Sequence, residues 1–228
     1  MRLTVQWTLA LVLIVSGVGV SAQERELTTN QELASYALGV QVAFSIRHQS
    51  GQFQMDPQAV AMGIEDVLSG RDLRYEPAQL QMAMADYQEE MKAKRGNVAE
   101  ENLVKAVEFL TANQSKNGVI ETDSGLQYKV YVEGEGESPG AGASVLVHYR
   151  GTLLDGTEFD SSYSRGEPIV LQSDQVILAW QEALAMMKPG AKWELYVHPD
   201  LGYGEQGSGA SIGPNAAMIF QVELLSVQ

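Results

Sequence analysis

The spacing of apolar residues changes at Gly118, and this change divides the chain into two structural classes. Before Gly118 apolar residues recur every three or four positions, as on one face of a helix; beyond it they alternate, as in strands. The longest helical pattern runs from Pro77 to Asn117. A helix of roughly 38 residues extends about 57 Å, more than the width of a small domain. Residues 92–97 at its centre are charged and include Gly96, so we expect a spacer helix that packs at both ends and is bare in the middle.

Two shorter helices are predicted upstream of this spacer. Thr29-Asn30-Gln31-Glu32 has the spacing of a capping box, and an amphipathic helix is expected from there to about His48. Its apolar face consists of Leu33, Tyr36, Ala37, Val40 and Phe44. Asp56-Pro57 predicts the start of the second helix, and Gly70 lies just past its end.

Helices this short bury too little apolar surface to be stable alone. We therefore expect a homodimer, in which the N-terminal helices of two copies share one core. One alternative is that these helices pack back onto the C-terminal part of the same chain. A second alternative is a chaperone surface, because methionine side chains adapt to varied partners. The methionines in question are Met55, Met62, Met82, Met84 and Met91.

Residues 1–22 have the composition of a cleavable secretion signal. Arg2 is the only charge among them, Leu9–Val15 is an unbroken apolar run, and Val20-Ser21-Ala22 supplies the small residues of a cleavage site. A polar segment follows at once, and the apolar run is short for a membrane span. The alternative is an N-terminal anchor that stays attached. The chain has no cysteine, which excludes disulfides and a lipid-modified cysteine after the signal.

Charge and histidine spacing exclude other classes of protein. The chain has 29 acidic against 15 basic residues, a formal charge of −14, and its only basic cluster is Lys92–Arg95. It should repel phosphate backbones, so nucleic acid is not an expected partner. His48, His148 and His198 have no partners at metal-ligand spacing, and we expect no metal or other cofactor. His148 is expected on the surface, opposite the buried face of its strand.

Beyond Gly118 the pattern predicts an α+β domain. Three strands are expected, around Val145–Leu153, over Lys192–Val197, and from Met218 to the end of the chain. One short helix should lie between the first two strands. Its apolar face consists of Ile177, Trp180, Leu184 and Met187. A single helix against a curved antiparallel sheet is the expected architecture.

Four segments of this domain resemble, in order, the signature of FKBP-type peptidyl-prolyl cis-trans isomerases. They are Val147–Ser162, Gln175–Leu184, Pro199–Gly204 and Ile219–Leu225. The helical front half resembles the dimeric exported FKBPs of Gram-negative bacteria, the macrophage infectivity potentiator type. Its matching segments are Ser35–Gly39, Met62–Gly70 and Gly125–Val130.

The resemblance implies a domain organisation and a location. A signal peptide (1–22) would precede a helical dimerisation domain (23–75), a long linker helix (76–117) and an FKBP-type isomerase domain (118–228). It also implies export to the periplasm, with outer-membrane association or secretion as further options.

The implied reaction is rotation about X-Pro bonds in unfolded or folding polypeptides. This reaction needs no nucleophile, metal or cofactor, because it breaks amide resonance rather than a covalent bond. An apolar pocket favours the twisted amide, which is less polar than the planar one. The residues implied as catalytic are Asp160, Tyr203 and the backbone amide of Ile177. Those implied as substrate-binding are Tyr149, Phe159, Ile169, Val176, Trp180, Ile212 and Phe220. The resemblance further implies binding of macrolide inhibitors.

Other interpretations of these residues stay open. Taken alone, Phe159, Trp180 and Phe220 fit plain core aromatics, and Asp160 a turn residue. The domain could also be a silent adaptor that docks a partner. Three departures from the family pattern affect substrate preference rather than activity. Ile169 replaces an aromatic residue, Ala179 replaces a glycine, and the loop 207–214 lacks a histidine and should be floppy.

Overall fold

The computed structural model describes residues 26–50 and 55–228. The predicted secretion signal lies outside these residues. The chain forms two units, the first ending at Gly51 and the second beginning at Gln52. No helix among the described residues has both the length and the apolar content needed to cross a membrane.

The described part of the first unit consists mainly of helix α1, Asn30–Ser50. The predicted capping box is present: the Glu32 amide donates to Thr29 Oγ1 over 3.2 Å, and the Thr29 amide donates to Glu32 Oε2 over 3.0 Å. The prediction of one apolar face was incomplete. Leu38 and Val42 are also apolar and exposed, and at 100° per residue they point away from the predicted face. The helix therefore presents apolar side chains on two sides.

The second unit begins with helix α2, Pro57–Leu68. Asp56 caps it as predicted, accepting from the amides of Gln58 at 2.8 Å and Ala59 at 3.2 Å. Gly70 follows the helix with a positive φ of 66°.

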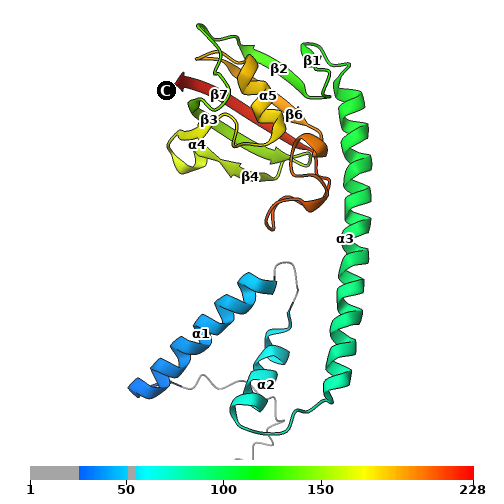
Figure 1. The fold of residues 1–228 in the computed structure, drawn as a ribbon, viewed down its shortest axis with the longest axis vertical. Coiled ribbons are helices and arrows are strands. Elements are labelled where there is room, and N and C mark those ends of the chain that lie inside the picture. Colours follow the sequence, from blue (N-terminus) through cyan, green and yellow to red (C-terminus); the bar gives the residue numbers. More distant parts are fainter. Residues whose placement is uncertain (1–25, 51–54) are drawn as a thin grey trace, which may run out of the picture. The chain divides into compact units, whose positions relative to one another are not determined.

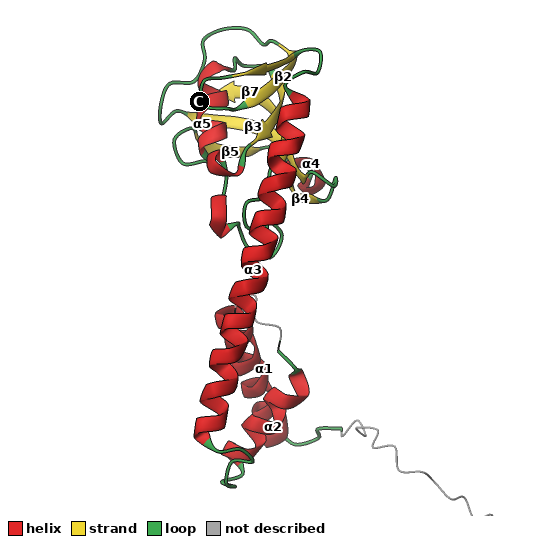
Figure 2. Cartoon of the chain, turned by 90° about the vertical axis from the view of Figure 1, so that its right-hand side faces the viewer, coloured by secondary structure: helices red, strands yellow, loops and turns green. Residues whose placement is uncertain are grey.

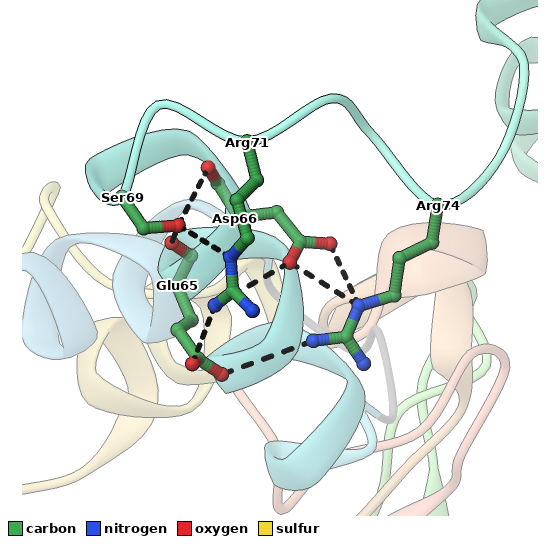
Figure 3. Close-up of polar contacts among 5 residues, drawn as sticks. All are labelled: Glu65, Asp66, Ser69, Arg71 and Arg74. Atoms are coloured by element: carbon green, nitrogen blue, oxygen red, sulfur yellow. Dashed lines mark hydrogen bonds and ion pairs between the residues drawn. The ribbon is translucent and has the colours of Figure 1, made fainter.

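The turn after α2 is held by ionic contacts (Figure 3). Asp66 is 4% exposed and accepts from Arg74 Nε at 3.2 and 2.9 Å. Arg71 donates to Glu65 at 2.6 Å and to Ser69 Oγ at 2.7 Å. A buried carboxylate is stable only when it is bonded in this way. Asp66 therefore anchors the start of the segment that leads to the next helix.

Helix α3, Pro77–Asn113, is one uninterrupted helix of 37 residues that leads into the sheet (Figure 2). Its last turns pack on the sheet through Ala106 and Leu110, which are buried. The expectation of a bare centre was wrong at Arg95. The Arg95 guanidinium donates to the carbonyl oxygens of Gln206 at 2.8 Å and Glu205 at 3.3 Å. A long flexible arginine can reach a loop that the apolar pattern of α3 does not reveal.

The rest of the second unit is an antiparallel sheet with α5, Leu178–Met186, lying across it (Figure 1). The strand order is β1-β2-β6-β7-β3-β4, and β5 also pairs with β3. The strands are β1 (Val119–Glu121), β2 (Gln127–Val132), β3 (Ser144–Leu153), β4 (Glu158–Ser161), β5 (Ile169–Gln172), β6 (Lys192–Val197) and β7 (Met218–Val227). The α+β architecture is confirmed.

The core lies between the sheet and α5. It contains Trp180 and Leu184 from the helix and alternating residues of β3 and β7, such as Val147 and Val222. The single-helix expectation missed α4, Ser162–Arg165, one helical turn capped by Ser161 Oγ, which accepts from the Ser164 amide. Two 3-10 turns, η1 (Pro199–Leu201) and η2 (Gly204–Gln206), flank Tyr203.

His148 is half-buried, whereas the alternation of β3 predicted a surface residue. Its Nδ1 lies 2.9 Å from the Oγ of the buried Ser162. Its ring stacks on Tyr163 with centroids 4.6 Å apart. The reason is α4, which covers this part of the outer face of β3 and which the strand pattern could not indicate.

Candidate functional site

A pocket of about 390 Å³ opens at one end of the core. That volume is in the range of small-ligand sites, and most of its walls are apolar. It is lined by Tyr149, Phe159, Asp160, Ile169, Leu171, Gln175, Val176, Ile177, Trp180, Tyr203 and Phe220. All the predicted site residues except Ile212 therefore lie around one opening. Ile212 is buried in the core instead.

Several elements contribute to this pocket. Strands β3, β4, β5 and β7 contribute side chains to the walls. The N-terminal end of α5 contributes Val176, Ile177 and Trp180. Tyr203 enters from the turn between η1 and η2. Since the strands and α5 share one packed core, most of the walls are rigid, and Tyr203 alone among the aromatic residues comes from a loop.

The aromatic rings of the pocket meet edge to face. Trp180 is perpendicular to both Tyr149 and Phe220, with centroids 5.3 and 5.5 Å apart. Phe159 is perpendicular to Phe220 at 5.5 Å. Edge-to-face contacts hold each ring in one orientation. Trp180 is 4% exposed, so it is fixed in the core behind the cavity.

Gly151 explains how Phe159 reaches this position. A Cβ at Gly151 would lie 2.6 Å from Phe159 Cζ and 2.9 Å from a carbon of the Phe220 ring. Real contacts at that distance do not occur, so both rings lie directly against the bare backbone of β3. A strand glycine with this role marks a close approach of other groups.

Asp160 is held at the pocket rim by two donors. Its Oδ2 accepts from the Tyr149 hydroxyl and its Oδ1 from Arg165 Nη1. Arg165 Nη2 donates to the hydroxyl oxygen of Tyr149 over 2.9 Å, so the three side chains are joined in a closed ring of hydrogen bonds. A carboxylate with two such partners has a fixed orientation.

The hydrogen bonds from Tyr149 and Arg165 keep the carboxyl group of Asp160 ionised. Burial raises the pKa of Asp160, but the bonds from Tyr149 and Arg165 outweigh burial and leave that pKa below its ordinary value. Burial and the bond to Asp160 raise the pKa of Tyr149. Burial, and then the negative charge of Asp160, raise the pKa of Tyr203. At neutral pH the pocket therefore holds one carboxylate and two neutral phenols.

Ile177 lies at the N-cap of α5, next to the pocket. The first amides of a helix take no part in its internal hydrogen bonds. The Ile177 N–H can thus donate to a ligand. The Tyr203 hydroxyl makes no hydrogen bond to any residue that the structure describes.

Sequence reasoning missed three residues of this site. Leu171 and Gln175 line the pocket, and Arg165 orients Asp160. A basic residue five positions after an acidic one was the only available signal for Arg165. It was overlooked because the one-turn helix α4, which brings the two together, is too short to predict.

The loop after Tyr203 also differs from expectation. It was predicted to be floppy, but Ser208 and Ile212 exchange two backbone hydrogen bonds, at 2.9 and 3.1 Å. The Gly207 amide donates back to the carbonyl oxygen of Tyr203 at 3.1 Å. Gly207 has a positive φ of 61°, and a Cβ there would lie 2.3 Å from the Ile212 oxygen. The glycines thus permit a tight loop rather than a loose one.

The site has the features needed to bind and reorient a neutral, cyclic, apolar group. It offers rigid aromatic walls, one fixed carboxylate and candidate donors at Ile177 and Tyr203. Among residues 26–50 and 55–228, no group of three or more potential metal ligands comes together.

Two family models match the chain. Residues 135–225 match the FKBP-type peptidyl-prolyl cis-trans isomerase model. Residues 31–130 match the domain that lies amino-terminal to FKBP-type peptidyl-prolyl isomerases.

Known proteins are similar over most of the chain. Peptidyl-prolyl cis-trans isomerase Mip of Coxiella burnetii is 43% identical over 206 residues, which cover 89% of each sequence. Outer membrane protein MIP of Legionella longbeachae is 40% identical, over 89% of this chain and 88% of its own. The crystal structure of FkpA from Escherichia coli aligns with a TM-score of 0.62 at 31% identity, over 89% of this chain and 99% of that one.

Proposed function

The chain belongs to the family of FKBP-type peptidyl-prolyl cis-trans isomerases, and we propose that the pocket around Trp180 is where it rotates X-Pro bonds of folding polypeptides. The observation that carries this proposal is the convergence of Tyr149, Phe159 and Phe220 with a single fixed carboxylate. The planar X-Pro amide is separated from its other isomer by a barrier of about 18–20 kcal/mol.

The proposed mechanism is selective binding of the twisted amide. The prolyl ring would lie on Trp180 with Phe159 and Phe220 beside it. Twisting removes resonance and leaves the amide less polar, so an apolar enclosure favours the twisted state over the planar one. The Ile177 amide and the Tyr203 hydroxyl would hold the polypeptide backbone, and the Asp160 charge would act on the rotating carbonyl.

The rate of isomerisation of an X-Pro peptide, measured with the purified protein, tests this assignment. Asp160→Asn keeps the shape of the side chain but removes its charge, and we expect slower turnover. Glu158→Gln is the matched control, since Glu158 lies two residues away on β4 and pairs with Arg150. A wild-type protein without activity would contradict the assignment of the pocket as an isomerase site. An Asp160→Asn variant as active as wild type would contradict the role of the Asp160 charge.

We also propose that the helical residues 23–75 form a homodimer. The two apolar sides of α1, with Leu33 and Leu38 on different sides, support a helix that is covered on both. On α2, Met62 and Ile64 are likewise exposed apolar side chains. Sedimentation of the purified protein should give a dimer, and Leu38→Glu should give a monomer with an intact isomerase domain.

A second candidate function is chaperone activity. Met82 and Met84 on α3 are exposed, and methionine surfaces accept varied apolar partners. Suppression of aggregation of an unfolded protein without proline would measure this activity apart from isomerisation. Protection equal in wild type and Asp160→Asn supports it; no protection by either rejects it.

The proposed location is the bacterial envelope. The charge and apolar pattern of residues 1–22 supports export, and one relative is named an outer membrane protein. Cleavage after Ala22 predicts that the protein recovered from the producing bacterium begins at Gln23. An N-terminus at Met1 would contradict the cleavage.

A further inference from the structure

Helix α3 contacts the loop that carries Tyr203. Asn102 Nδ2 donates to the Pro214 oxygen over 2.9 Å, and Asn215 Nδ2 donates to the Ala99 oxygen over 3.4 Å. Two turns earlier, Arg95 donates to the carbonyls of Glu205 and Gln206. The helix thus holds both ends of the segment 204–215.

Asn215 continues this connection toward the pocket. The backbone amide of Asn215 donates to the carbonyl oxygen of Gly204 over 2.9 Å, and Gly204 follows Tyr203 directly. Asn215 has a φ of 52° and is the one non-glycine residue with a positive φ in the described chain. Asparagine tolerates this conformation better than most residues, but it still has an energetic cost that surrounding contacts must offset. The hydrogen bond from Asn215 Nδ2 to the Ala99 oxygen of α3 is one of the contacts that offset this cost.

The position of the Tyr203 hydroxyl depends on this backbone. It has no hydrogen bond of its own to a described residue, and 38% of Tyr203 is exposed. The other aromatic side chains of the pocket come from core strands and α5. Tyr203 instead comes from the turn between η1 and η2, so the position of its hydroxyl depends on the loop that α3 holds.

We propose that Asn102 is a positioning residue of the isomerase site, which holds the Tyr203 hydroxyl in place through Pro214, Asn215 and Gly204. Arg95 supports the same loop from its other end. The proposal rests on the proposed function, since it assigns α3 a part in the same pocket. The linker helix is then a structural part of the site and not only a spacer.

A double-mutant cycle tests the proposal in the full-length protein. The variants are Asn102→Ala, Tyr203→Phe and their combination, and kcat/KM is measured on an X-Pro peptide. A misplacement of about 1 Å can cost about 100-fold in rate, so the smaller shift that follows the loss of one anchor should cost roughly 3- to 10-fold in Asn102→Ala. In the Tyr203→Phe background the same substitution should cost less than about twofold, because the hydroxyl that it misplaces is gone.

Asn97→Ala is the matched control, because Asn97 is an exposed asparagine of the same helix. It should leave kcat/KM unchanged. Thermal unfolding of each variant reports on folding. Should Asn102→Ala fail to fold, Arg95→Met, which removes the second anchor at a more exposed position, is tested in the same cycle.

Each outcome decides the matter. Equal losses in both backgrounds mean that Asn102 acts independently of Tyr203, and no loss means that it does not act on the site; either overturns the proposal. A wild-type protein that does not isomerise the peptide rejects the proposed function itself, which is a different result from an active enzyme insensitive to Asn102→Ala.

Discussion

Asp160 and Arg165 form an ion pair at the rim of the aromatic pocket, with Nη1 of the guanidinium donating to Oδ1 of the carboxylate. The two residues are five positions apart and belong to β4 and α4. The pair orients Asp160, the one acidic side chain among the described residues that line the pocket. It therefore links the short helix α4 to the chemistry of the site.

Arg165→Met should lower turnover several-fold by releasing Asp160. Without the guanidinium the pKa of Asp160 rises, because burial is then opposed only by the Tyr149 bond and weaker backbone contacts. The fall in kcat/KM at acid pH should accordingly begin at a higher pH than in wild type. A pH–rate profile on an X-Pro peptide measures both effects.

Arg150→Met is the control for this prediction. Arg150 is also paired with a carboxylate, Glu158 at 2.6 Å, and its side chain is 46% exposed against 44% for Arg165. It does not line the pocket. Its loss should leave the pH–rate profile unchanged. Identical profiles for the two arginine variants would show that Arg165 has no special role.

Asp160 should also make stability depend on pH. Its pKa in the folded protein lies below the ordinary 3.8. A group of this kind stabilises the folded state above its unfolded pKa, and the stabilisation is lost as pH falls through the folded pKa. The difference in unfolding free energy between wild type and Asp160→Asn should be constant from about pH 8 to 5 and shrink below the ordinary pKa. Urea unfolding at several pH values checks this; a difference that already shrinks near about pH 6 contradicts it.

The long elements of the fold could be predicted from sequence because each carries many repeats of its period. Helix α3 starts at the predicted Pro77, and the expected strands β3 and β7 have ten residues each. Strand β6 spans Lys192–Val197 as expected, but β2, which also has six residues, was missed, as was the three-residue β1. Strands β4 and β5 have four residues each, too few to show alternation. The one-turn helix α4 was missed for the same reason.

The pocket was predicted through whole motifs, whereas its supports were not. Phe159 and Trp180 lie in recognisable segments, and the structure brings both to one opening. The contacts of Arg95 with Gln206 and of Asn102 with Pro214 join residues more than a hundred positions apart. No local pattern predicts such pairs, because they depend on how α3 packs against the completed sheet.

Gly151→Ala should disrupt the pocket and destabilise the domain. The added methyl would clash with Phe159 and Phe220, and overpacking of a core costs about 1–3 kcal/mol. Displaced rings should also lower kcat/KM. Gly96→Ala makes the same change in the exposed centre of α3, where nothing lies within 4 Å of the new methyl. It should stabilise the helix by about 0.5–1 kcal/mol and leave turnover unchanged. Effects of the same sign in both variants would contradict the packing argument.

Asp66→Ala should destabilise the turn between α2 and α3 without affecting the peptide reaction. The substitution removes the acceptor of Arg74 and leaves a small buried gap, since Asp66 is the one buried residue of α2. Loss of charged hydrogen bonds to a buried carboxylate costs about 1–3 kcal/mol. Chemical unfolding followed by helical circular dichroism measures the effect, and kcat/KM on a short X-Pro peptide should stay at the wild-type value.

Glu65→Ala separates burial from charge in the same turn. Glu65 pairs with Arg71 at 2.6 Å, closer than any contact of Asp66, but its side chain is 62% exposed. An exposed ion pair contributes less than about 1 kcal/mol, because water screens the charges and both side chains lose freedom. Asp66→Ala should therefore destabilise more than Glu65→Ala, despite the longer distance of its pair. Should Glu65→Ala prove the more damaging of the two, charge rather than burial would govern this turn.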